Sequence, residues 1–305
     1  MVFSGTFLLL LLVGLLLPAT PRAASSLLSS KVDKDSLLRT VPAPRLILVG
    51  GSNLSFGIDG KMLQDSLGLR PVNTAIHASL GLRYMLRSVE PHVRPADVVL
   101  VVPEYSHYYS SNTNCSPELL RTILDVAPED IRLLRPEQYP DFIAELPKYA
   151  LTKFKPGEYF FDPTPTVYSR AAFDEYGDVT LQRRLPPRSV APKVVAAGEG
   201  YNESVLEDMT AFATRIRERG GSVIVSFPGL QEQSFDNLGK RIDRVHRELL
   251  NSPLTVAGKP ADFQMADSLL FDTPYHLNGK GVAVRTVRLV ELLRPLLWRQ
   301  GISRE

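Results

Sequence analysis

Cysteine is almost absent from this chain of 305 residues, because Cys115 is the single one. An intrachain disulfide and a cysteine-based metal site are therefore excluded. Cys115 lies in the polar run SSNTNCSPE, which predicts a loop, and no nearby motif offers a partner that would activate its thiolate. We interpret it as an incidental thiol rather than a catalytic one.

A charge excess of either sign is also missing. Lys and Arg total 35 against 33 Asp and Glu, so no electrostatic argument supports nucleic acid as a partner. No His, Asp and Glu group has metal-ligand spacing, and GGSNLSFG lacks both the Gly-x-Gly-x-x-Gly spacing and a following Walker lysine. The sequence therefore predicts no metal and no other cofactor.

Long apolar runs are missing except at the N-terminus. Phe7 to Ala19 reads FLLLLLVGLLLPA without a charge, which is shorter than the roughly 20 residues of a comfortable membrane span. Together with the small residues of the following PRAASS, it predicts a signal peptide or signal anchor over residues 1–24. The alternative is a buried core helix. With a signal, the folded part lies outside the cytoplasm, periplasmic or secreted, and a retained segment would anchor it to the membrane.

The remainder alternates apolar strands with amphipathic helices. Residues 25–44 resemble a polar linker, and residues 45–298 form one α/β domain. Short connections predict a three-layer α/β/α sandwich with a mainly parallel, five-stranded, flavodoxin-like sheet. The strands are expected at 45–49, 71–77, 97–102, 222–227 and 254–256, and helices at 59–67 and 281–293, with further helical stripes from Leu82, Val205 and Leu238.

Residues 110–200 interrupt this alternation after the third strand. A segment of about ninety residues is far longer than an ordinary connection, so we interpret it as an inserted subdomain. Helices are expected at 117–125 and 139–154. The insertion leaves the carboxyl end of a strand, where α/β proteins place their sites. A lid or partner-docking role and a surface decoration both fit.

One serine follows the first strand in a position that suits a nucleophile. Ser52 comes after Gly50 and Gly51 in LILVGGSNLSFGID, and a serine nucleophile needs a histidine base oriented by a carboxylate. His276 lies in FDTPYHLNGKG, with Asp272 four residues ahead. The other four histidines occur in a turn, on an amphipathic helix or just after strands: His92, His246, His77 and His107.

Three motifs in this order resemble the SGNH/GDSL hydrolase superfamily. They are VGGSN after the first strand, NTAIHASLG after the second and FDTPYHLN near the C-terminus, and the resemblance covers Arg45 to Leu293 apart from the insertion. It implies that Ser52 is the nucleophile, His276 the base and Asp272 the acid. It also implies that the backbone N–H groups of Ser52 and Gly81 form an oxyanion hole.

The motifs depart from the superfamily pattern in three places. Gly51 stands where the first motif usually has Asp, and the third strand ends VVPEYSHYY without the usual Asn. Three residues rather than two separate Asp272 from His276. The strand ending is more similar to the divergent branch that acts in cell-envelope polysaccharide O-acetylation and to D-alanyl-lipoteichoic acid transfer proteins. Members of that branch are membrane-anchored or periplasmic and work beside a multi-pass membrane acyltransferase.

The resemblance implies an acyl-ester enzyme, an O-acetyltransferase or an esterase acting on an envelope glycan through an acyl-Ser52 intermediate. Its partners would be an acyl ester or acylated glycan as substrate and a membrane-embedded acyltransferase. The alternative is a catalytically inactive scaffold or glycan-binding protein with the same fold. Five residues are expected to line the pocket, with turn chemistry or sheet-end packing as the alternative for each: Asn53, Glu104, Tyr105, His107 and Asn278.

Overall fold

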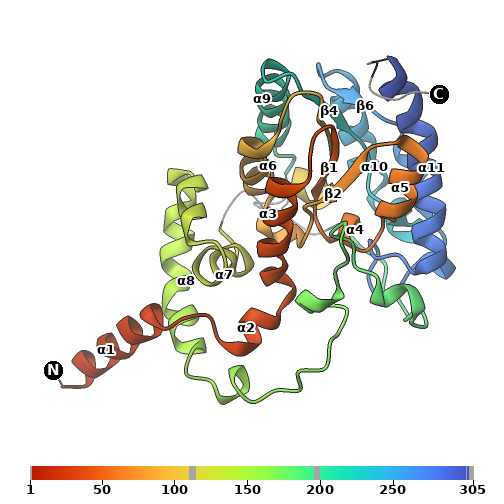
Figure 1. Cartoon of the computed structure of the whole chain (residues 1–305). Helices are drawn as coiled ribbons and strands as arrows, with labels where there is room; N and C mark the ends of the chain where they lie inside the picture. The colour runs from red at the N-terminus through yellow and green to blue at the C-terminus, as the bar shows by residue number, and fades with distance from the viewer. Residues whose placement is uncertain (1, 110–114, 196–199, 300, 302–305) are drawn as a thin grey trace.

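A five-stranded parallel sheet forms the centre of the molecule in a computed structural model, which describes residues 2–109, 115–195, 200–299 and 301. Its strands are β1 (Arg45–Gly50), β2 (Arg70–Asn73), β3 (Val98–Val102), β4 (Ser222–Val225) and β6 (Thr255–Val256). Their order is β2-β1-β3-β4-β6, with every neighbouring pair parallel (Figure 1). The predicted flavodoxin-like sheet is therefore confirmed.

Helices cover both faces of this sheet, as the three-layer prediction requires. Figure 1 shows α5 (Gly60–Leu67) beside α11 (Gly279–Arg299), and α6 (Leu82–Val89) beside α9 (Ser204–Glu218) on the other side. The helix α10 (Glu232–Leu250) leads to β6. Every residue of β1 and β3 is buried, which explains their uninterrupted Leu and Val pattern.

Some short elements were not predicted. A one-turn helix, α4 (Ser52–Ser55), follows β1 directly, where the sequence indicated only a turn. Strands β5 (Leu230–Gln231) and β7 (Gln264–Met265) form a second, two-stranded sheet. These elements have only two to four residues each, too few for a periodic pattern.

The prediction of a polar linker at residues 25–44 is wrong. This stretch forms a 3₁₀ turn, Leu27–Ser30, and the helix α3 (Lys31–Thr40), which follow α2 (Pro21–Ser25). The buried Lys34 Nζ donates to the carbonyls of Asn73, at 2.8 Å, and Gly177, at 2.6 Å. Because these contacts satisfy a lysine inside the protein, the segment packs on the domain despite its polar composition. Burial lowers the pKa of Lys34 to about 7.

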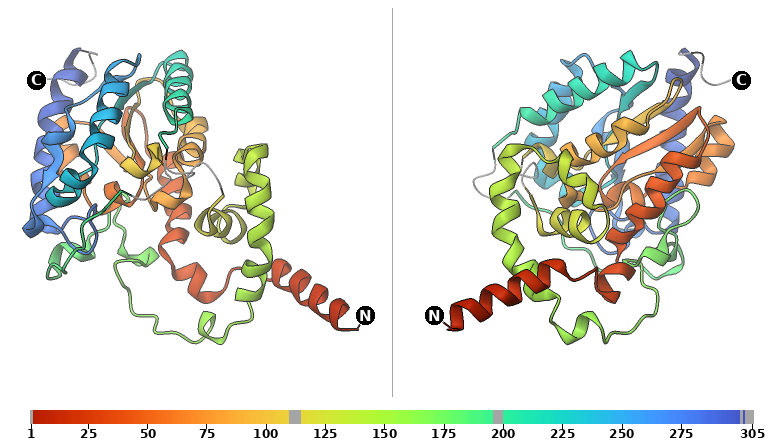
Figure 2. Two further views of the ribbon diagram at one scale, coloured as in Figure 1. Left: turned by 180° about the vertical axis from the view of Figure 1, so that it is seen from behind. Right: turned by 60° about the vertical axis from the view of Figure 1, so that its left-hand side comes forward.

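The inserted segment begins beside the sheet domain and then runs back against it, where the Val179 N–H donates to the Ser55 carbonyl at 2.8 Å. It contains α7 (Pro117–Asp125) and α8 (Tyr139–Thr152), followed by 3₁₀ turns and irregular chain; its residues 110–114 and 196–199 lie outside the described residues. Figure 2 shows these two helices, with α1 (Val2–Leu16), standing apart from the sheet.

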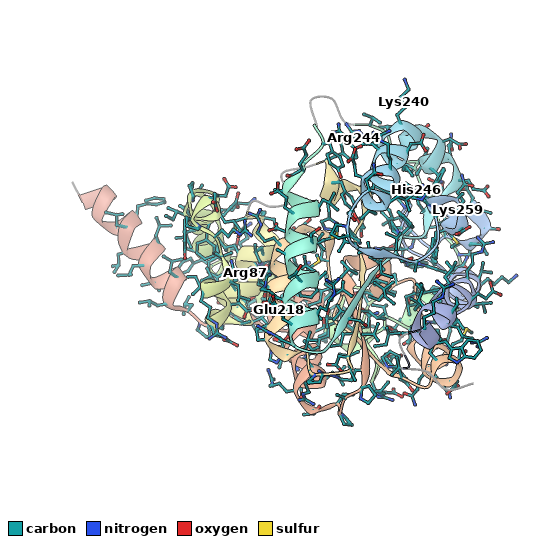
Figure 3. All side chains as sticks on the ribbon, turned by 90° about the horizontal axis from the view of Figure 1, so that it is seen from above. Arg87, Glu218, Lys240, Arg244, His246 and Lys259 are labelled. Atoms are coloured by element: carbon teal, nitrogen blue, oxygen red, sulfur yellow. The ribbon has the colours of Figure 1, made fainter. Side chains whose placement is uncertain are left out.

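The N-terminal helix projects from the molecule rather than entering its core. Figure 3, viewed from above, shows it leaving on the side opposite to α10, which carries Lys240, Arg244 and His246. Most of its leucines are exposed, with Leu8 at 65% and Leu16 at 76%. Among the described residues, Gly5–Ser25 is the one helical stretch long and apolar enough to cross a membrane. The N-terminal segment therefore does not form the buried core helix of the alternative interpretation.

Candidate active site

Ser52, His276 and Asp272 come together at the carboxyl edge of the sheet. The Ser52 Oγ lies 2.9 Å from the His276 Nε2, and the His276 Nδ1 lies 2.8 Å from the Asp272 Oδ1. Two successive hydrogen bonds thus connect a hydroxyl, an imidazole and a carboxylate, which is the arrangement of a serine triad. The sheet brings Ser52 to this edge because it follows β1 directly, at the first position of α4.

The loop before α11 holds the imidazole in place. The backbone N–H of His276 donates to the carbonyl of Thr273 at 3.2 Å and to its hydroxyl at 3.1 Å. This tight turn brings the Asp272 side chain back to the ring despite the three intervening residues. The imidazole ring also stacks face to face on the Phe56 ring, with 4.1 Å between the ring centroids and 8° between the ring planes. The long spacing in FDTPYH is therefore compatible with the acid–base contact.

A third group on the acid comes from the insertion. The Tyr168 hydroxyl donates to the Asp272 Oδ2 at 2.5 Å and lies 3.4 Å from the His276 Nδ1. Sequence reasoning missed Tyr168, because it lies in PTPTVYSR, a stretch without periodicity about a hundred residues before the acid. The insertion therefore contributes directly to the candidate site.

These contacts keep Asp272 ionised. Partial burial would raise the pKa of its carboxyl, but the hydrogen bonds from His276 and Tyr168 outweigh burial and hold the pKa below its usual value. Burial, assisted by the contact with Asp272, raises the pKa of the Tyr168 phenol. Tyr168 is thus a neutral donor and Asp272 a charged acceptor at neutral pH.

The glycine before Ser52 is explained by a close approach. A Cβ at Gly51 would lie 2.8 Å from the Glu104 Oε1, 2.9 Å from the Ala78 Cβ and 3.0 Å from the Ala78 Cα. The aspartate that the superfamily usually has here would not fit without moving these groups. Gly51 is therefore matched to Glu104, which follows β3.

One of the two backbone donors expected for an oxyanion hole is engaged. The N–H of Gly81 donates to the Ala78 carbonyl at 3.0 Å and closes a 3₁₀ turn. It is therefore not free for a substrate, contrary to the prediction. The N–H of Asn53, which was not among the expected donors, is also engaged, because it donates to the Glu104 Oε1 at 3.3 Å. The N–H of Ser52 is the first of α4, a position that has no acceptor within the helix.

Three of the expected pocket residues are structural. Asn53 is fully buried, and its Nδ2 donates to the Val102 carbonyl at 3.2 Å. Asn278 caps α11, because its Oδ1 accepts the N–H groups of Lys280 and Gly281 at 3.0 and 3.1 Å. Tyr105 is buried in the core. Packing at the end of the sheet, rather than pocket lining, is what the structure shows for these side chains.

Glu104 and His107 join the end of β3 to the loop that precedes Gly81. The Glu104 N–H donates to the His107 Nδ1, and the His107 Nε2 lies 3.0 Å from the Ala78 carbonyl. The first bond makes Nδ1 the acceptor, so Nε2 carries the proton and donates. Burial lowers the pKa of His107, which keeps the ring neutral. Glu104 and His107 therefore hold the backbone of Asn53 and Ala78 in place beside Ser52.

A buried arginine that was not predicted contacts the residue after Ser52. Arg285 of α11 donates to the Asn53 carbonyl and, at 3.0 Å, to the Asn53 Oδ1. Burial lowers the pKa of its guanidinium to about 9. The sequence did contain a signal, since Arg285 falls on the same helical stripe as Val282 and Leu289, where an apolar residue is expected.

A hollow of about 550 Å³ lies next to Tyr168. It is bounded by α2 and by the insertion: Arg22, Ser25, Ser26, Phe160, Phe161, Asp162, Pro163, Thr164, Thr166 and Ser169 also line it.

In the described part of the chain, no three His, Cys, Asp or Glu side chains are grouped as metal ligands would be. Burial raises the pKa of Cys115 to about 12, so its thiol is poorly suited to nucleophilic chemistry.

No protein-family model matches this chain, and no curated protein matches it significantly. Among solved structures, the protein YxiM from Bacillus subtilis is similar at 14% sequence identity and a TM-score of 0.37. The match covers 85% of this chain and 58% of YxiM, so the chain spans less than two thirds of that protein. A likeness of this degree carries no argument about function.

Proposed function

We propose that the protein is a serine-dependent acyl-ester enzyme of the SGNH type, with Ser52 as nucleophile, His276 as base and Asp272 as orienting acid. One observation carries the proposal: the two hydrogen bonds, of 2.9 and 2.8 Å, that connect these side chains although Ser52 and His276 are 224 residues apart. A serine in contact with a histidine that is itself held by a carboxylate is the recognisable sign of nucleophilic catalysis.

The chemistry follows from this geometry. The Ser52 Oγ attacks the acyl carbonyl while His276 Nε2 takes the hydroxyl proton. The tetrahedral intermediate then expels the alcohol, which receives that proton from His276, and leaves an acyl-Ser52 ester. Water or a sugar hydroxyl attacks this ester and gives its proton to His276. His276 then returns the proton to the Ser52 Oγ as the acyl group leaves, which restores the hydroxyl and the neutral imidazole. Asp272 stays ionised throughout and stabilises the imidazolium.

We further propose an acyl group on a cell-envelope glycan as the substrate, and a membrane-embedded acyltransferase as the partner. Support comes from the strand ending VVPEYSHYY, which is similar to the envelope O-acetylation branch, and from the exposed apolar helix α1. That helix is weakly compatible with an extracytoplasmic protein held by a signal anchor.

A second candidate function is an inactive scaffold, and a specific observation favours it. The N–H groups of Gly81 and Asn53 are bound within the protein by the Ala78 carbonyl and by Glu104. An oxyanion hole depends on donors that are free for the developing charge, and one such donor is typically worth about 2.7–4 kcal/mol. A site that supplies only the Ser52 N–H would be a weak catalyst.

Active-site labelling separates the two candidates. The full chain is treated with a fluorophosphonate, and the modified peptide is identified by mass spectrometry. The enzyme proposal expects an adduct on Ser52 that is lost in Ser52→Ala and retained in Ser66→Ala, a matched serine on α5. If the wild type stays unlabelled and hydrolyses p-nitrophenyl acetate no faster than Ser52→Ala, the scaffold function replaces the enzyme proposal. If the labelling occurs, unlabelled enzyme is given p-nitrophenyl acetate and a sugar; acetyl transfer to the sugar rather than to water makes it a transferase.

A further inference from the structure

The helix α8 has an exposed apolar face. Its residues recur at the spacing of one helical side and continue just past the helix end: Tyr139, Ile143, Pro147, Leu151 and Phe154. Ile143 is 61% exposed and Phe154 41%. We propose that this face lies in the interfacial layer of a lipid bilayer, parallel to the membrane surface.

The rest of α8 fits this placement. Phe142 and Tyr149 face the core of the protein, where they are buried. Asp141, Glu145 and Lys148 share a third, polar side. The helix therefore has one apolar side for the protein, one polar side and one further apolar side whose large side chains stay exposed. An amphipathic helix with this division typically buries its apolar face about 5–10 Å into the boundary between headgroups and acyl chains.

The apolar helix α1 packs against this same helix. A Cβ at Gly14 would lie 2.4 Å from the Ala150 carbonyl oxygen, so the two backbones approach as closely as glycine permits. On the helical wheel Ala150 falls between Tyr139 and Ile143. The membrane-length stretch thus crosses α8 on the side that carries its exposed apolar residues.

The end of α1 is also fastened to the end of α8. The buried Lys153 Nζ donates to the Pro18 carbonyl at 3.0 Å, and the Thr20 hydroxyl donates to the Glu158 carboxylate at 2.7 Å. These bonds fix the direction in which α1 leaves the insertion. The two helices therefore approach a membrane as one unit.

The relative directions of the helices supply the last step. In Figures 1 and 2, α8 runs across α1, and α1 points away from the sheet domain. With α1 along the membrane normal, α8 lies along the surface and the catalytic domain stays in water. The occupant of the face is thus the lipid that surrounds α1. This inference concerns α8 alone and holds whether or not Ser52 is catalytic.

Depth-dependent quenching tests the placement on the full chain. The protein carries Cys115→Ala and one new cysteine, at Ile143→Cys or, as the matched control on the polar side, at Lys148→Cys. Each is labelled with the fluorophore NBD and reconstituted in vesicles of phosphatidylcholine and phosphatidylglycerol containing brominated lipid. Both positions are exposed, so the substitutions leave the fold intact, and equal thermal midpoints of the two variants check this.

We expect the label at position 143 to emit at shorter wavelength and to be quenched several-fold more strongly than the label at position 148. Equal quenching at the two positions, or none at either, overturns the inference. So does shielding of position 143 that occurs in native membranes but not in pure lipid vesicles, because a protein partner would then cover the face.

Discussion

Gly51→Ala perturbs the turn that carries Ser52, because it adds one methyl group where the surrounding atoms leave no room for it. Its Cβ would meet the Glu104 Oε1 at 2.8 Å, the Ala78 Cβ at 2.9 Å and the Ala78 Cα at 3.0 Å. A carboxylate at the end of a flexible side chain can move aside, but the Ala78 backbone belongs to the loop held by His107. The strain therefore falls on the turn that carries Ser52.

The size of the effect follows from these contacts. Overpacking a close-packed site typically costs about 1–3 kcal/mol, and moving Glu104 also releases the Asn53 N–H that it accepts. We expect the free energy of unfolding to fall by about 1–3 kcal/mol. A displacement of the Ser52 Oγ by an ångström from the His276 Nε2 is expected to slow fluorophosphonate labelling about 100-fold.

Gly239→Ala is the matched control. Gly239 lies inside α10, and a Cβ there would meet nothing within 4 Å. Alanine in a helix interior is more favourable than glycine by roughly 0.5–1 kcal/mol, so this variant should be slightly more stable and label at the wild-type rate. Urea unfolding and the labelling rate are measured for both. If Gly51→Ala unfolds and labels like the wild type, the close packing of Gly51, Glu104 and Ala78 is not what fixes the turn.

Two further predictions concern the acid. Tyr168→Phe keeps the ring near Phe56 but removes the hydroxyl bond to the charged Asp272. Losing a hydrogen bond to a charged group, worth about 1.5–3 kcal/mol, should slow labelling roughly 10- to 100-fold; an unchanged rate would mean that Tyr168 does not position Asp272. Because the folded-state pKa of Asp272 lies below its usual value, its ionised form stabilises the fold above the unfolded pKa of about 3.9, and this contribution is lost as pH falls through the lower folded value. The stability difference between wild type and Asp272→Asn, measured by urea unfolding, should therefore be constant above about pH 4 and shrink below it; a constant difference down to pH 2 would contradict the pKa shift.

The sheet and the triad partners were predictable because their signals are local. Continuous runs such as VVLVV predict buried parallel strands, and Ser52 follows one of them. Asp272 and His276 lie four residues apart in one loop, so a single turn brings them together. The parallel topology then places Ser52 and this loop at the same sheet edge.

The supporting contacts were not predictable in the same way. Tyr168 reaches Asp272 across 104 residues, and Arg285 reaches Asn53 across 232. Such contacts depend on how the insertion and α11 pack, which no local pattern records. The same holds for Lys34. A charged side chain favours the prediction of an exposed linker, but the Lys34 ammonium donates to backbone carbonyls inside the protein. The engaged N–H of Gly81 likewise reflects a 3₁₀ turn set by its surroundings.

The bonds at the base of α1 connect proteolytic processing to stability. Thr20 is buried, accepts the Ala23 N–H and donates to Glu158, while the Pro18 carbonyl receives Lys153. A leader peptidase cutting after Ala24 would remove these partners together and leave the Lys153 and Glu158 side chains without them. The free energy of those contacts would then oppose release of the cleaved leader. The leader would dissociate from the rest of the chain more slowly than a leader that makes no such contacts.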